Sequence, residues 1–101
     1  MKADKLKKVV ENTVEKEADS IFEDMQLHPS DYEGVDPDDE DECWVNAIEL
    51  AKDKVWANPT GLIDEDVQEE MTEKNWHQVY EFIDPINWKT FASEEVKRCF
   101  A

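Results

Sequence analysis

The chain has 101 residues, and its 27 acidic side chains against 11 basic ones give a formal net charge of −16. At this length we expect one domain over residues 1–101, because so short a chain buries apolar surface for only one modest core. So negative a charge argues against direct binding to nucleic acid or to anionic membranes, which attract positive charge. Four Trp, four Phe and two Tyr favour a folded domain over a disordered one.

No stretch approaches the roughly 18 uncharged apolar residues that a membrane span needs, so we expect none. The short apolar pair Val9-Val10 is followed at once by Glu11, so we also expect no secretory leader. These features predict a cytoplasmic protein in which Cys43 and Cys99 are reduced, buried thiols.

Residues 3–26 predict an amphipathic helix, because apolar side chains recur there every three or four positions. The apolar stripe consists of Leu6, Val10, Val14, Ala18, Ile21, Phe22 and Met25. The opposite face carries Glu11, Glu15, Asp19 and Glu23 at a spacing of four, where like charges repel. Residues 28–42 follow as a loop with two prolines, one glycine and eight acidic residues.

A second helix is predicted over residues 40–57, with Trp44, Ile48, Ala51 and Val55 on one face. Asn58-Pro59-Thr60-Gly61 ends that pattern.

A third helix is predicted over residues 64–84, with a break near Thr72, which is a candidate N-cap. Asp84-Pro85 is expected to open a fourth helix over residues 85–100, because proline is favoured at the first helical position. No alternating apolar run of strand type is present. The sequence therefore predicts an all-α fold, a compact bundle of about four helices.

The charge is unevenly distributed along the chain. Residues 1–16 have a net charge of +2, whereas residues 17–51 contain thirteen acidic residues and no Lys or Arg. A second base-free block, residues 55–73, contains six acidic residues. A net charge of magnitude about 2–8 already keeps a small domain soluble, and a larger one destabilises the compact state. We therefore expect the negative field to serve a function.

Such a field imitates a nucleic acid and suits a basic groove. In size, in charge and in its lack of catalytic motifs, the chain resembles the DNA-mimicking inhibitors that phages and mobile elements often encode. We expect its partner to be a basic nucleic-acid-binding protein, such as a restriction or CRISPR effector, a nuclease or a repair enzyme. The candidate partner-binding residues are Asp31, Glu33, Asp36, Asp38, Asp39, Glu40, Asp41 and Glu42, then Asp64, Glu65, Asp66, Glu69 and Glu70, with Tyr32 and Trp56 as exposed aromatic residues.

Two alternatives stay open. Colicin-type immunity proteins are also small acidic helical bundles, and the stretch His28-Pro29-Ser30 with Asp31 and Tyr32 is loosely similar to their inhibitory region. This resemblance implies an antitoxin against a cationic nuclease, although only one predicted helix precedes the stretch here instead of two. The other alternative is a general interaction module that binds through apolar surface and carries its charge for solubility.

The sequence predicts no enzyme, no metal and no cofactor. Calcium loops of the EF-hand type need Gly at position 6, and the two possible registers place Asp36 or Asp41 there. His28, Cys43, His77 and Cys99 are too widely spaced for a zinc motif. No catalytic signature surrounds any of these residues.

Overall fold

The computed structural model describes residues 1–32 and 34–87, and all regular structure within them is helical. The elements are α1 (Ala3–Leu27), the 3₁₀ helix η1 (Pro29–Asp31), α2 (Glu40–Ala57), α3 (Pro59–Leu62), α4 (Glu65–Glu69) and α5 (Glu73–Ile83). The predicted all-α class and the compact bundle are confirmed. No helix in the described ranges is long and apolar enough to cross a membrane.

The first two helices agree closely with the sequence prediction, since α1 is one residue longer than expected and α2 has the expected bounds. The predicted third helix is broken where expected. Thr72 caps α5, because its hydroxyl oxygen accepts a hydrogen bond from the Asn75 N–H at 3.2 Å.

Two local predictions need correction. The stretch that was expected only to end α2 forms the short helix α3, capped by the Asn58 side chain, which accepts from the Gly61 N–H at 3.2 Å. At the other site, Asp84 is not an N-cap, because it has helical backbone angles instead of the extended ones that an N-cap needs. Residues 85–87 form a turn and irregular chain, and the rest of the predicted helix over 85–100 lies outside the described residues.

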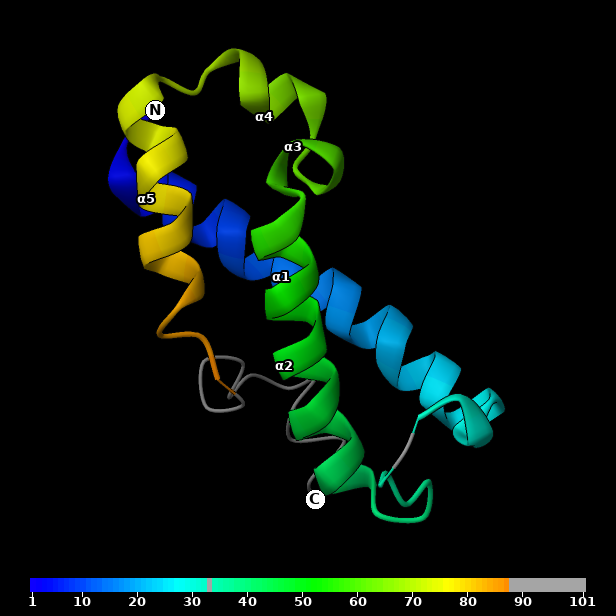
Figure 1. Ribbon diagram of the computed structural model, residues 1–101. Coiled ribbons are helices and arrows are strands. Elements are labelled where there is room, and N and C mark those ends of the chain that lie inside the picture. Colours follow the sequence, from blue (N-terminus) through cyan, green and yellow to red (C-terminus); the bar gives the residue numbers. More distant parts are fainter. Residues whose placement is uncertain (33, 88–101) are drawn as a thin grey trace.

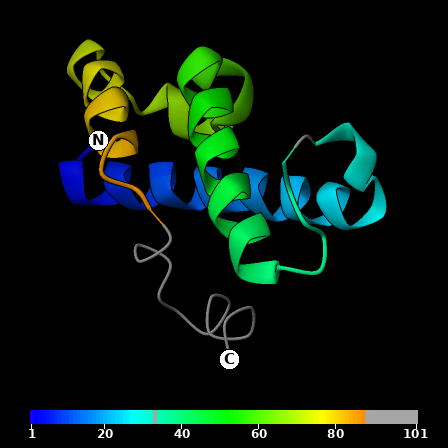
Figure 2. The ribbon, with the colours of Figure 1, turned by 60° about the horizontal axis from the view of Figure 1, so that its bottom comes forward.

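The helices are arranged around α1. In two views α1 lies across both α2 and α5, which run antiparallel to each other, while α3 and α4 connect their ends (Figures 1 and 2). The acidic loop, residues 36–42, lies where α1 ends and α2 begins, and α4 lies at the opposite end of α2 (Figure 1). An 18-residue helix such as α2 spans roughly 27 Å.

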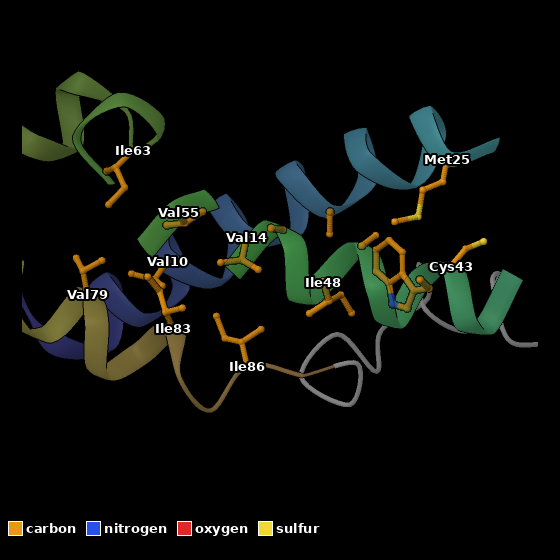
Figure 3. Close-up of a cluster of buried hydrophobic side chains, with 14 of the residues drawn as sticks. Val10, Val14, Met25, Cys43, Ile48, Val55, Ile63, Val79, Ile83 and Ile86 are labelled. Carbon is orange, nitrogen blue, oxygen red and sulfur yellow. The ribbon is translucent and has the colours of Figure 1, made fainter. Parts of the chain in front are cut away.

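The core follows the apolar stripe of α1. Near its start, Val10 lies close to Ile83 of α5 and Val55 of α2 (Figure 3). Toward its end, the ring of Phe22 meets Trp44 edge to face, with 5.9 Å between ring centroids. Trp44 is buried as predicted, and Trp76 is partly buried against the same core, whereas Trp88 lies outside the described residues.

The start of the chain is fastened to α5 by Asn75, the one buried polar residue in the described part of the chain. Its Nδ2 donates to the backbone oxygen of Met1 at 3.0 Å, and its Oδ1 accepts from the Met1 ammonium at 3.2 Å. The same Oδ1 accepts from the Thr72 N–H at 2.9 Å. One amide thus completes the capping box of α5 and holds the beginning of α1.

We expect Asn75→Ala to lower the free energy of unfolding by about 2 kcal/mol, because it removes a cap interaction and leaves buried polar groups without partners. Urea denaturation monitored by circular dichroism measures this. The same substitution at the exposed Asn12 of α1 is the control, with an expected change within about 0.5 kcal/mol. Equal effects of the two substitutions would contradict the role given to Asn75.

Candidate functional site

The acidic loop is formed by local hydrogen bonds of its own aspartates. The Asp36 carboxylate accepts from the Asp38 N–H at 3.0 Å, and the Asp36 carbonyl accepts from the Asp39 N–H at 3.0 Å. The Asp39 carboxylate caps α2 by accepting from the Glu42 N–H at 3.1 Å. Asp36 and Asp39 therefore shape the loop. Within residues 1–32 and 34–87, the exposed carboxylates of Asp38, Glu40, Asp41 and Glu42 accept no such local hydrogen bond.

The loop forms an open concave surface of about 390 Å³. The described residues that line it all carry carboxylates, namely Asp36, Asp38, Asp39, Glu40 and Asp41. Within the described residues, no Lys, Arg or His forms an ion pair with any of them. The positive end of the α2 dipole lowers the cost of gathering negative charge here. The arrangement suits binding to a positively charged surface.

Across residues 1–32 and 34–87, no cluster of three or more His, Cys, Asp or Glu side chains is placed to hold a metal ion. Carboxylates spread around an open depression lack the convergent geometry that Ca²⁺ or Mg²⁺ needs.

Tyr32 lies in the segment that leads into the acidic loop. Its side chain is half-buried, whereas the sequence predicted that it is exposed. Its hydroxyl donates to Asp24 Oδ2 at 2.5 Å, and this bond ties the segment after η1 to α1. The hydrogen bond to Asp24, together with burial and the negative charges of Asp24 and Asp31, raises the pKa of Tyr32 to about 12. Gly34 follows with φ of 74°, a left-handed conformation that glycine adopts without strain.

Cys43 lies beneath the loop and is buried, as predicted, while Cys99 lies outside the described residues. Its Sγ–H donates to the Asp36 carbonyl at 3.2 Å. Burial raises the pKa of the Cys43 thiol, and the nearby charges of Asp39, Glu42 and Asp36 raise it further. The thiol therefore stays protonated and is a poor nucleophile.

The second acidic cluster, formed by Asp64, Glu65, Asp66, Glu69 and Glu70, lies around α4. It is partly neutralised by the basic start of α1. Lys5 Nζ lies 3.4 Å from Glu70 Oε2, and the Met1 ammonium donates to the Glu70 carbonyl at 3.1 Å. Lys16 lines the same cleft as Asp64. The two predicted clusters are thus separate surfaces, and the acidic loop has the less compensated field.

The remaining predicted residues are Asp31, Glu33 and Trp56. Asp31 is exposed in η1, and Glu33 lies outside the described residues. Trp56 is 50% exposed, as predicted, but it lies away from the acidic loop, near the C-terminal end of α2. Its indole packs edge to face on Tyr80 of α5, with 4.8 Å between ring centroids.

The sequence pattern does not predict the cleft in which Trp56 lies. An open cleft of about 320 Å³ is lined there by Glu49, Lys52, Asp53, Trp56, Ile83 and Asp84. Lys52 and Glu49 lie four and seven positions before Trp56, so the helical period places them on one face. Asp84 follows α5, and no local pattern links it to α2. We call this hollow the Trp56 cleft.

Comparison of the chain with family models, with curated proteins and with solved structures finds no match.

The raised pKa of Tyr32 predicts a pH dependence of stability. The phenol loses its proton at about pH 10 in the unfolded chain and at about pH 12 in the folded chain. The stability contributed by the hydrogen bond is therefore full below pH 10 and is lost as the pH rises toward 12. The urea concentration at the unfolding midpoint is measured for the wild type and for Tyr32→Phe. The difference between the two midpoints should decrease as the pH rises from 10 toward 12. A difference that is the same at every pH would show that Asp24 does not retain the phenol proton.

Proposed function

We propose that this chain is an acidic inhibitor that occupies the nucleic-acid-binding surface of a basic partner protein. It acts in the cytoplasm as a DNA mimic, presenting carboxylates in place of phosphates. An origin in a phage or another mobile element fits its size and charge. No bond is made or broken, because the proposed function is competition for a surface.

The observation that carries the proposal is the uncompensated acidic loop. Five carboxylate residues line an open concave surface of about 390 Å³, and no basic side chain of the described residues pairs with them. Elsewhere the fold does pair its acids, as with Glu17, whose Oε2 lies 2.8 Å from Lys54 Nζ. The difference between the paired Glu17 and the unpaired carboxylates of the loop supports the proposal that the negative field at the loop is used for binding.

The magnitudes also favour a nucleic-acid mimic. The longest dimension of the molecule is 42 Å, and duplex DNA of that length carries about 25 negative charges. The chain carries a net charge of −16, which is roughly two thirds of that line density. A basic groove built for DNA would attract this protein by electrostatic steering, with an association rate that falls as salt is added.

Charge reversal in the loop should remove binding. We expect Asp38→Lys combined with Asp41→Lys to weaken partner binding tenfold or more, because two favourable charges become repulsive. The measurement begins with capture of proteins on the immobilised wild type and elution by a salt gradient. The protein eluted is then tested for displacement by duplex DNA and for loss of capture by the double variant.

A matched control is available on α5. Glu73→Lys with Glu81→Lys makes the same change in net charge, and each pair combines one acid in the first turn of a helix with one exposed acid elsewhere. The control pair should retain the partner. The proposal fails if the partner resists about 0.5 M salt, at which exposed charges are strongly screened, or if both pairs bind alike. Capture of one nuclease toxin, with no effect on unrelated DNA-binding proteins, would favour an immunity role instead.

A further inference from the structure

The Trp56 cleft combines an aromatic surface with an excess of negative charge. It lies between α2 and the end of α5, and the large apolar side chains that line it among the described residues are Trp56 and Ile83. The same lining contributes three carboxylates, those of Glu49, Asp53 and Asp84, and one ammonium group, that of Lys52. So many carboxylates disfavour an anionic ligand, and the limited apolar lining disfavours a purely apolar one.

The indole of Trp56 is fixed in place yet open to solvent. Tyr80 packs against it at a centroid distance of 4.8 Å and an interplanar angle of 64°, while half of the Trp56 surface stays exposed. A large, rigid aromatic side chain left half exposed is typical of an anchor at a protein interface. The face of an indole is also the best aromatic partner for a cation.

The cleft already holds one cation of the protein itself. Lys52 Nζ donates to the Asp84 carbonyl at 3.0 Å and lies 3.9 Å from Glu49 Oε1, and its side chain is only 16% exposed. The end of α5 and the carboxylates therefore stabilise positive charge at this place. Within the described residues, the carboxylates of Asp53 and Asp84 form no ion pair, so negative charge is left for a second cation.

We infer that the Trp56 cleft binds the guanidinium group of an arginine side chain presented by a partner protein, stacked on Trp56 and paired with Asp53. A planar guanidinium stacks on an aromatic face and donates two parallel hydrogen bonds to one carboxylate, which an ammonium does not do. The inference rests on the proposed function in one respect, because it assigns the arginine to the same basic partner.

The test uses the whole folded chain and a defined probe, N-acetyl-arginine amide. Amide and indole N–H resonances are followed by ¹H–¹⁵N NMR at about 0.01 M ionic strength, where charges are weakly screened. Trp56→Phe assigns the Trp56 indole signal. We expect saturable shifts at that indole and at neighbouring residues of α2. N-acetyl-citrulline amide, which has nearly the same shape but no charge, should cause shifts at least tenfold smaller.

Two variants with the same charge change locate the effect. Asp53→Asn should weaken the response to the arginine probe at least threefold. Glu81→Gln, an exposed acid of α5 that does not line the cleft, should leave it unchanged. Asp53 is itself exposed and not part of the core, so loss of folding does not complicate this comparison. Trp56→Ala should abolish the saturable component.

Three results would overturn the inference. The first is shifts of equal size with the arginine probe and the citrulline probe. The second is an equal response of Asp53→Asn and Glu81→Gln to the arginine probe. The third is chemical-shift changes spread evenly over all acidic regions of the chain. The outcome is independent of the test of the proposed function. If the chain binds the arginine probe but does not compete with DNA for a partner, the proposed DNA-mimic function is refuted and arginine binding in the Trp56 cleft stands. If it competes with DNA but does not bind the arginine probe, only the inference about the Trp56 cleft is refuted.

Discussion

The fold depends on one constraint, an unbroken apolar stripe along the 25 residues of α1. Both α2 and α5 pack on this helix, and α1 provides most of the contacts between elements. Leu6, Val10 and Val14 are buried within the same stripe that extends to Met25. Because α2 and α5 both pack on α1, none of the acidic residues in the described ranges is buried, and they lie on outward helix faces and in loops. The surfaces available for binding are decided by this geometry.

Self-repulsion is the second constraint, and the fold reduces it selectively. Glu17 and Glu70 are paired with lysines that lie far away in the sequence, Lys54 and Lys5. The Asp24 carboxylate accepts a hydrogen bond from the Tyr32 hydroxyl. Among the described residues, the carboxylates of the acidic loop accept hydrogen bonds from backbone N–H groups alone and lie at the positive end of the α2 dipole. Ion pairs thus relieve charge between elements, whereas none forms at the acidic loop within these residues.

The sequence predicted what local physics determines. The spacing of apolar residues and the N-cap residue predicted α1, α2 and the break at Thr72, because these features depend on residues that are close together in the sequence. Four-residue α3 was not foreseen, since so short a helix has no period to detect and depends on Gly61. An added Cβ there would lie 2.3 Å from the Asn58 side chain, so only glycine leaves room for the cap. The burial of Tyr32 and the Trp56 cleft depend on packing between separate elements, which no local pattern encodes.

The charges along α1 run against the usual preference of a helix. Its N-cap is Lys2, its first turns carry Lys5, Lys7 and Lys8 against the single acid Asp4, and its last turns carry Glu23 and Asp24. The peptide dipole is also positive at the start of a helix and negative at its end, so side chains and backbone add instead of cancelling. Helix α1 is therefore an electric dipole along its length, with its negative end toward the acidic loop. Near a basic surface it experiences a torque that turns the acidic loop forward, so its orientation is selected before contact.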